Sequence, residues 1–461
     1  MISILIVVFV LGYVSITLEH NIHLDKAVPA LLMATLMWAI LAFGFNEGWI
    51  SVINHHGDVF SVLKSNSEVS IEQQGFKDIL IHHFSKTGEI LFFLIGAMTI
   101  VEIIDLHRGF GIIKKFIKAK NKKHLLWTLG SLAFLLSAII DNLTAIIILV
   151  ALLRKILVRR KYRIWYASMM IIAANAGGAW SPIGDVTTTM LWIGDKVSAI
   201  GLTEYVVLPS IVCFIVPFFI ATKLKPFRGY AMRKEMIIDK DAERLLSSKT
   251  MLIVGLLGIA FVPVFKGITG LPPYLGMMFS LAMVWLVSEY VKPEKNISPK
   301  DKFRYSTHKA LSKIEFSSIL FFLGILLAVG ALESVVFGEI DGKMVGSLRY
   351  AAESVSNAIP SMDVVIVLLG MMSAVLDNVP LVAASMGMYD YPIDSPMWHF
   401  IAYSAGTGGS LLVIGSAAGV AAMGMEKIDF IWYFKKVSWL AFLGFIAGCG
   451  LFVFIEAFFY A

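Results

Sequence analysis

The sequence predicts an all-α polytopic membrane protein, and three observations lead to that class. Of the 461 residues, 58% are hydrophobic and only 16% are charged, and the mean hydropathy is +0.79. A chain of this composition cannot bury its apolar residues in a soluble core. Uninterrupted apolar runs such as 205–222 and 439–459 have the length of membrane helices rather than the alternation of barrel strands. We therefore expect helices that cross a lipid bilayer.

Charge placement orients these helices. The chain has 39 basic and 33 acidic residues, which gives a net charge of +6. The basic stretches, which the positive-inside rule assigns to the cytoplasm, are 114–123, 154–163, 223–249 and 292–313. The stretches expected outside are the acidic 339–363 and 390–394 and the mixed-charge 46–86. The positive charge is therefore a topological signal, and no nucleic-acid partner is expected.

Two short motifs occur twice, in the same order. An Asp-Asn pair lies inside an apolar run at Asp141-Asn142 and again at Asp377-Asn378. Each pair is followed by a glycine-rich run, first at 177–185 and then at 408–416. An ionised Asp at the bilayer centre costs about 2.5–3.5 kcal/mol, so it persists where partners, water or a cation compensate its charge. The duplication predicts two structural repeats that share a cation site.

The spacing of the basic stretches predicts a re-entrant helical hairpin. About thirty residues separate the first two stretches, whereas two full crossings need roughly forty apolar residues. Residues 125–153 are therefore expected to enter and leave on the cytoplasmic side, with Asp141 near the tip. Residues 364–388 lie between two outside stretches and should form the opposing hairpin, with Asp377 in its turn. Hairpins that enter from opposite faces indicate inverted-topology repeats.

The predicted domains are a first repeat at 1–222, a cytoplasmic linker at 223–249 and a second repeat at 250–461. Each repeat should contain about five transmembrane helices and one hairpin. Dense glycine, joined by proline in the first copy, should break the spans 164–200 and 397–425 at mid-membrane, over 175–185 and 404–416. The other spans are expected at 1–18, 27–45, 89–106, 203–222, 250–268, 271–289, 314–336 and 437–459. The first of them lacks the basic start and the cleavage site of a signal peptide.

Sodium and lithium prefer oxygen ligands, which carboxylates, amides, hydroxyls and carbonyls provide. We expect Asp141, Asp185 and Asp377 to hold Na⁺ or Li⁺. The other candidate cation- and proton-binding residues are Asn142, Thr144, Asn175, Thr187, Thr188, Asn378, Ser404, Thr407 and Ser416. Two simpler roles stay open, because the acids can cap the helices that follow them and the glycines can serve tight helix packing.

Burial disfavours the charged form of a carboxyl, so protons and a metal ion should compete for the same acids. Competition combined with alternating access is sufficient for cation/proton exchange and needs no cofactor. Glu102 and Glu333 are second candidates for a proton path. The histidine pairs at 55–56 and 82–83 are expected to be solvated in an outside loop. Cys213 and Cys449 are expected to be buried free thiols.

These motifs resemble those of the NhaD-type sodium/proton antiporters of the ion transporter superfamily. The run Gly-Gly-Ala-Trp-Ser-Pro-Ile-Gly-Asp-Val-Thr-Thr at 177–188 is the most specific part, and the resemblance covers most of the chain. It implies a multi-pass protein of the bacterial inner membrane that exchanges sodium or lithium for protons in pH and salt homeostasis. It also implies a homodimer with a scaffold and an elevator-like transport domain.

Two transporter classes of the same architecture stay open as alternatives: a sodium-coupled dicarboxylate transporter and an oxyanion permease, for example for arsenite. Hairpin tips of the dicarboxylate class carry Ser-Asn-Thr, whereas the tips here carry Asp-Asn. A fixed negative charge repels an anion, which favours a cation as the substrate. An ATP-driven pump is not expected, because no Walker A motif is present. A membrane scaffold or sensor that transports nothing would need no acid at either tip.

Overall fold

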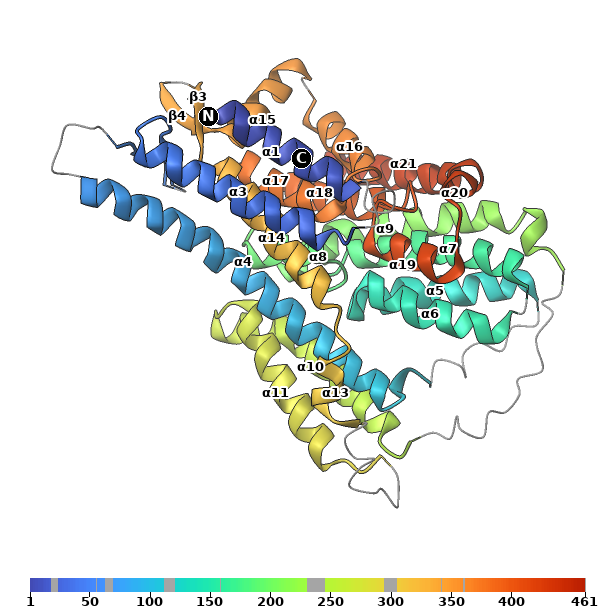
Figure 1. The fold of residues 1–461 in the computed structure, drawn as a ribbon. Helices are drawn as coiled ribbons and strands as arrows, with labels where there is room; N and C mark the ends of the chain where they lie inside the picture. The colour runs from blue at the N-terminus through green and yellow to red at the C-terminus, as the bar shows by residue number, and fades with distance from the viewer. Residues whose placement is uncertain are drawn as a thin grey trace. The chain divides into compact units, whose positions relative to one another are not determined.

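The computed structural model describes residues 1–17, 24–54, 56–62, 69–111, 121–157, 159–229, 245–293, 305–340, 342–359 and 361–460. Helices dominate these residues (Figure 1). Within the described ranges, the helices long and apolar enough to cross a membrane are Ala27–Asn46, Lys122–Ile140, Ala199–Ala221, Ser248–Thr269, Phe316–Glu333 and Ser438–Phe458. The prediction of a helical, multi-pass membrane protein is confirmed at this level.

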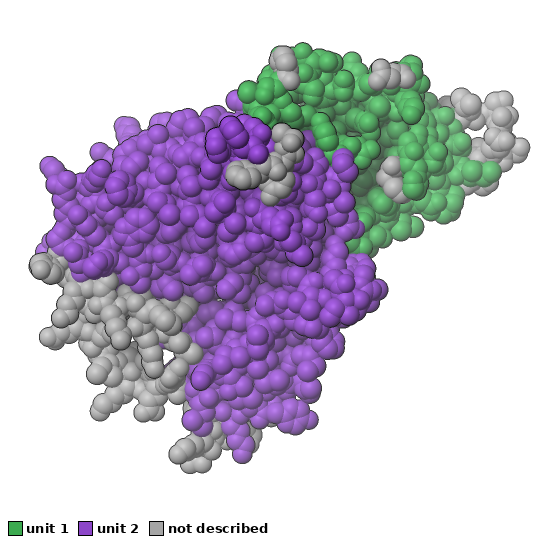
Figure 2. Space-filling model, turned by 180° about the vertical axis from the view of Figure 1, so that it is seen from behind, with its two compact units in different colours: residues 1–91, 315–365, 379–391 green, residues 92–314, 366–378, 392–461 purple. Residues whose placement is uncertain are grey.

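The chain forms two compact units, each drawing on both halves of the sequence (Figure 2). Unit 1 comprises residues 1–91, 315–365 and 379–391; unit 2 comprises 92–314, 366–378 and 392–461. The units interleave along the chain, so they are a different division from the predicted sequential repeats, whose boundaries stay a prediction. The predicted linker falls partly outside the described residues, at 230–244, and so does most of the basic stretch at 114–123.

Unit 1 is built around helix α3 (Ala27–Asn46), which packs against α1 (Ile2–Thr17) and α14 (Phe316–Glu333). The Trp38 indole Nε1 donates a hydrogen bond of 2.8 Å to the Leu327 carbonyl and so fixes α3 on α14. Small elements of this unit not expected from the sequence are the antiparallel strand pairs β1 (Val52–Ile53) with β2 (Val59–Phe60) and β3 (Val336–Ile340) with β4 (Lys343–Gly346), and helix α15 (Ser347–Ala358).

Helix α4 (Val69–Leu106) begins twenty residues earlier than the predicted span at 89. Residues 69–86 were expected in an outside loop because the polar stretch 46–86 has mixed charge. That expectation is wrong, since one face of this helix is apolar: Phe76 stacks on Phe45 with ring centroids 5.0 Å apart. His82 and His83 are therefore partly buried helical residues rather than loop histidines. The Nε2 atom of His83 lies 3.0 Å from Ser334 Oγ, and His55 lies outside the described residues.

Unit 2 has helix α7 (Arg160–Ala179) at its centre, with all residues from Tyr166 to Ala179 buried. Helices packed against α7 are α5 (Lys122–Ile140), α6 (Asn142–Ile156), α9 (Ala199–Ala221), α18 (Pro396–Gly408) and α19 (Ala417–Glu426). The remaining elements of this unit are α8 (Val186–Ile193), η2 (Lys225–Phe227), α10 (Ser248–Thr269), α11 (Pro273–Tyr290), α13 (Thr307–Leu311), α20 (Phe430–Lys436), α21 (Ser438–Ile455) and η5 (Glu456–Tyr460). Cys213 and Cys449 are buried free thiols, as expected.

Both predicted broken spans are interrupted, but later than expected. Helix α7 continues through Asn175 to Ala179, and α8 begins only at Val186. Likewise, α18 continues through Ser404 to Gly408, and α19 begins at Ala417. A glycine inside a helix costs only about 1 kcal/mol, which tight packing offsets, whereas Pro182 removes a backbone donor outright. The two breaks therefore span residues 180–185 and 409–416.

The first predicted hairpin consists of α5 and α6, which pack side by side and are separated by Asp141 alone (Figure 1). With 19 residues, α5 is itself long enough to cross a membrane, so the re-entrant path stays a prediction. The second hairpin region contains α16 (Met362–Met372) and α17 (Asn378–Met388). Its residues 366–378 belong to unit 2 and its residues 379–388 to unit 1.

Glycines next to the breaks allow helices to approach backbone to backbone. A Cβ on Gly177 of α7 would collide with the Phe134 backbone of α5, and a Cβ on Gly408 of α18 would collide with the Gly370 backbone of α16. Small-residue packing, one of the two simpler roles left open by the sequence, is confirmed at these positions. It operates alongside the helix breaks rather than instead of them.

We expect Gly177→Ala to lower the stability of the folded protein by about 1–3 kcal/mol, because the added methyl group has no space against backbone atoms that cannot rotate away. The measurement is thermal unfolding of the purified protein in detergent. Gly450→Ala in α21 is the matched control, since a Cβ there meets nothing within 4 Å. Equal melting temperatures for the two variants would contradict the close packing of α7 on α5.

Candidate cation site

Asp185 is the centre of a buried polar cluster in unit 2. Its side chain lies at the end of the first break, directly before α8, and the residue is only 2% exposed. Oδ1 accepts a hydrogen bond of 3.1 Å from the Thr187 backbone N–H, which caps α8. Oδ2 accepts two amide hydrogen bonds, one of 2.7 Å from Asn142 Nδ2 and one of 3.1 Å from Asn378 Nδ2. One carboxylate oxygen therefore joins both duplicated Asp-Asn motifs.

Two further residues complete what we call the Asp185 cluster. Asn175 Oδ1 accepts a hydrogen bond of 3.2 Å from Asn142 Nδ2, and Asn175 Nδ2 donates one of 2.9 Å to Ser416 Oγ. Ser416 caps α19, as Asp185 caps α8. The cluster thus connects the ends of both breaks. Its members are Asn142, Asn175, Asp185, Asn378 and Ser416.

Asp141 lies at the turn between α5 and α6 with φ at 79°, a backbone conformation that costs a non-glycine residue about 1–3 kcal/mol. Its Oδ1 accepts a hydrogen bond of 2.7 Å from the Thr144 N–H. Its Oδ2 accepts one of 2.9 Å from Thr144 Oγ1. The capping role left open for the acids is therefore confirmed for Asp141 and Asp185. Thr144 contributes to the hairpin turn by donating two hydrogen bonds to the Asp141 carboxylate.

Two more acids adjoin the Asp185 cluster along the chain. Asp141 and Asp377 directly precede Asn142 and Asn378, whose amides donate to Asp185 Oδ2, and both acids are only partly buried. Negative charge next to a poorly solvated carboxylate attracts positive charge. The arrangement therefore favours occupancy by a positive charge, either a proton or a metal ion.

Other predicted site residues are placed differently. The Thr188 hydroxyl donates to the Ser181 carbonyl at 2.7 Å and is 2.9 Å from the Asp185 carbonyl. Ser404 and Thr407 donate to helix carbonyls, those of Ile366 and Tyr403, so the hydroxyl hydrogens of these two residues are directed away from the Asp185 cluster. Thr187 is fully buried, and its Oγ1 has no hydrogen-bond partner among the described residues, which leaves it available to a ligand.

The two glutamates proposed for a proton path are not members of the cluster. In unit 2, Glu102 Oε2 lies 3.7 Å from Lys313 Nζ, which also lies 3.9 Å from Asp105 Oδ2. Glu333 is the last residue of α14 in unit 1. The proposed role of both glutamates in a proton path stays a prediction.

Sequence reasoning missed two serines that fasten the hairpins to the broken helices. Ser137 Oγ donates a hydrogen bond of 2.6 Å to the Ala174 carbonyl, next to Asn175. Ser373 Oγ donates one of 2.7 Å to the Ala405 carbonyl in the second copy. Each serine stands four residues before the Asp of its motif. Because a serine occurs at the same position before both Asp-Asn pairs, this repetition could have identified the two serines from the sequence.

The chemistry of the donors fits a hard monovalent cation better than a transition metal. Among the described residues, no three His, Cys, Asp or Glu side chains are grouped to hold a metal ion. A cation at Asp185 would therefore take amide, hydroxyl or backbone oxygens as its other ligands, which are ligands suited to alkali ions.

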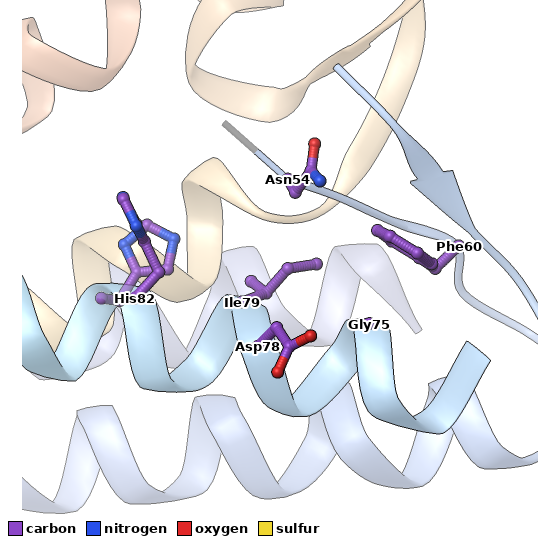
Figure 3. Close-up of a pocket in the computed structure, with 7 residues that line it drawn as sticks. Asn54, Phe60, Gly75, Asp78, Ile79 and His82 are labelled. Carbon is purple, nitrogen blue, oxygen red and sulfur yellow. The ribbon is translucent and has the colours of Figure 1, made fainter. Parts of the chain in front are cut away.

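A separate pocket of about 100 Å³ lies in unit 1 (Figure 3). Along one side of it, α4 carries Asp78 and His82, one helical turn apart, with Asn54 and Phe60 across from the helix. The Asn54 amide is already bonded to Asp58, and the Asp78 carboxylate to Gln74. None of the predicted site residues lines this pocket.

Comparison with known proteins connects this chain to membrane transporters. A protein family described as "Citrate transporter" matches residues 6–399. "Sodium/proton antiporter 1" of Arabidopsis thaliana is 41% identical over 445 residues, which cover 95% of this chain and 70% of that protein. "Sodium/proton antiporter 2" of the same plant is 38% identical over 95% of this chain and 96% of that protein.

Bacterial relatives match with lower identity over similar lengths. The "Na(+)/H(+) antiporter NhaD" of Alkalimonas amylolytica is 28% identical over 98% of this chain and 90% of that protein. The matches to a transporter family and to antiporters indicate a transporter rather than an enzyme. The chain therefore belongs to the citrate transporter family and is related along most of its length to the NhaD-type sodium/proton antiporters.

Proposed function

We propose that this protein exchanges sodium or lithium for protons across a membrane, and that Asp185 carries both cargoes in turn. The observation that carries the proposal is the convergence of Asn142 and Asn378 on one buried oxygen of Asp185. A buried carboxylate attracts a cation strongly, and amide groups from both hairpin regions can reorient when the cation arrives. The names of the plant and bacterial relatives support the same cargoes.

The exchange step is a competition at one site. When Asp185 is ionised, it can hold a sodium ion with Thr187 Oγ1 and neighbouring carbonyls as further oxygen ligands. When it is protonated, a ligand is lost and the sodium ion leaves. Asp141 and Asp377, which directly precede the two asparagines that donate to Asp185, add negative charge and so favour occupation of the site by a cation.

The proposed architecture is a pair of inverted repeats that alternate access to the site, in an elevator-like movement. The two breaks end with nearly identical backbone geometry: φ and ψ are −148° and 150° at Asp185, and −147° and 152° at Ser416. The serine-to-carbonyl hydrogen bonds at Ser137 and Ser373 are repeated as well. These matched contacts support the duplication. A homodimer in the bacterial inner membrane belongs to the same proposal and rests on resemblance.

The alternative is transport of an anion such as a dicarboxylate, for which the family description provides the reason. The buried Asp185 carboxylate opposes it, because an anionic substrate would meet negative charge there, with Asp141 and Asp377 next to the asparagines that donate to Asp185. The test is a proteoliposome assay in which sodium, lithium, potassium or citrate is added to vesicles that hold a pH gradient. Collapse of the gradient by sodium or lithium alone supports cation/proton exchange, whereas uptake of citrate without such collapse contradicts it.

We expect Asp185→Asn to abolish exchange while leaving insertion and folding intact, because the amide keeps the shape but cannot bind a proton or balance a cation. Asp141→Asn and Asp377→Asn should each reduce the rate severely. Asp429→Asn, at a cap of α20 away from the cluster, is the control. Exchange at the wild-type rate in Asp185→Asn would remove Asp185 from the site.

The apparent sodium constant should rise about tenfold for each pH unit on the acid side if one proton is displaced per cation, and more steeply if two are. The reason is mass action, since each protonated carboxyl is a lost ligand. The measurement is the sodium dependence of exchange in proteoliposomes at a series of pH values. A constant that stays flat while only the maximal rate changes would show that protons use another path.

The re-entrant path of α5 and α6 predicts that both ends of the hairpin face the cytoplasm. Lys123→Cys and Arg159→Cys replace exposed residues at these ends, and both should react with an impermeant thiol reagent only from the cytoplasmic side. Lys343→Cys in β4 should react only from outside. Labelling of positions 123 and 159 from opposite sides would rule the hairpin out.

A further inference from the structure

A buried carboxylate lies at the end of α19 that is far from the Asp185 cluster. Glu426 is the last residue of this helix, and its side chain is only 1% exposed. Its Oε1 lies 2.8 Å from Arg154 Nε, and its Oε2 lies 2.9 Å from Arg163 Nε. Arg154 lies in the last turn of α6, and Arg163 lies in the first turn of α7. Each carboxylate oxygen is thus bound to a different helix.

The same end of α19 is held through its backbone. Arg160 Nε donates a hydrogen bond of 3.1 Å to the Glu426 carbonyl, and Arg160 Nη2 donates one of 2.6 Å to the Lys427 carbonyl. Carbonyls at a helix C-terminus have no hydrogen-bond partner within the helix and carry partial negative charge. A guanidinium supplies both the missing hydrogen-bond donors and a positive charge. Three arginines therefore converge on the last turn of α19.

Helix α19 is short, and both of its ends are fastened. It has 10 residues, so it extends about 15 Å. Its N-terminal end is capped by Ser416, whose Oγ accepts the hydrogen bond from Asn175 in the Asp185 cluster. A rigid helix of this length transmits a displacement of one end to the other. Glu426 and Ser416 thus stand at opposite ends of one short helix.

We propose that Glu426 is a positioning residue for the cation site: it holds α19 against α6 and α7 and so places Ser416 on Asn175. This inference rests on the proposed function. The placement of Ser416 relative to Asn175, on which the inference depends, can be measured without a transport assay.

The first repeat offers a matched control at the far end of α8. Here Asp195 Oδ1 lies 2.7 Å from Lys266 Nζ, and that ammonium also donates to the Trp192 carbonyl at 3.3 Å. The arrangement resembles that at Glu426: an acidic and a basic side chain meet at the C-terminal end of the short helix that follows a break. The Asp195 side chain, however, is 66% exposed, so water and salt screen the pair. Replacing Asp195 should therefore leave the site almost unchanged.

The first experiment compares Glu426→Gln with Asp195→Asn in proteoliposomes. Glu426→Gln removes the buried counter-charge of Arg154 and Arg163, whose own side chains are partly exposed, and should raise the apparent sodium constant about tenfold, with a smaller change in maximal rate. Asp195→Asn should change the constant less than about twofold. A folded Glu426→Gln protein with the wild-type sodium constant, or equal shifts in the two variants, would overturn the proposal.

The second experiment measures the geometry directly. Asn175→Cys and Ser416→Cys are combined in a chain whose native cysteines are replaced by alanine, and the rate of oxidative cross-linking by copper phenanthroline is followed. Adding Glu426→Gln should slow cross-linking at least about fivefold, and adding Asp195→Asn should not. If the wild type shows no exchange but this difference holds, the proposed function fails and the positioning role stands. Equal cross-linking rates overturn the positioning role.

Arg154→Gln provides the same tests where Glu426→Gln does not fold. This variant removes the ion pair between Arg154, which is partly exposed, and Glu426, and it keeps the ion pair between Arg163 and Glu426. It should raise the sodium constant and slow cross-linking in the same direction, by smaller factors. An unchanged sodium constant together with an unchanged cross-linking rate in Arg154→Gln contradicts the proposal.

Discussion

The rest of unit 2 depends on one buried carboxylate and the amides that converge on it. Asp185 is almost fully withdrawn from solvent, and an isolated charge in that place would be costly. Asn142 and Asn378 reduce the cost by donating to the same oxygen, and the α8 N-terminus adds a backbone donor. Because these donors come from widely separated parts of the chain, the carboxylate can be stable only in the assembled unit.

This requirement explains the unusual backbone around the site. A continuous helix uses its N–H groups in its own hydrogen bonds, whereas a break creates a new helix start whose free N–H groups can bind a carboxylate. The breaks before Asp185 and Ser416 supply two such starts. Backbone contact at Gly177 and Gly408 brings the neighbouring helices close enough for the asparagines to reach. Stabilisation of the buried carboxylate and tight helix packing are thus parts of one arrangement.

Much of this arrangement was predictable because duplication is visible in the sequence. The Asp-Asn pairs and the glycine runs indicated which residues would meet, and Asn142, Asn175, Asp185, Asn378 and Ser416 do meet. The helical start of α4 was missed because hydropathy registers its polar face and not the packing of Phe76 on Phe45. Ser404 and Thr407 donate to helix carbonyls, a direction that sequence does not show, and their role as cation ligands stays a prediction.

Long-range ion pairs were the least predictable feature. The arginines near residue 160 served only as an orientation signal, and Glu426 is more than 260 residues away in the chain. No pattern in the sequence pairs them, because neither local spacing nor periodicity relates the two segments. Their meeting is a consequence of the packing of α19 on α6 and α7, which only the folded structure shows.

We propose that one carboxylate, that of Asp185, alternates between a proton and a sodium ion. The most direct test is to add sodium to the purified protein in weakly buffered detergent solution and record proton release with a pH indicator. We expect release of protons that saturates with sodium binding and disappears in Asp185→Asn. Sodium binding without proton release, or undiminished release in Asp185→Asn, would contradict it.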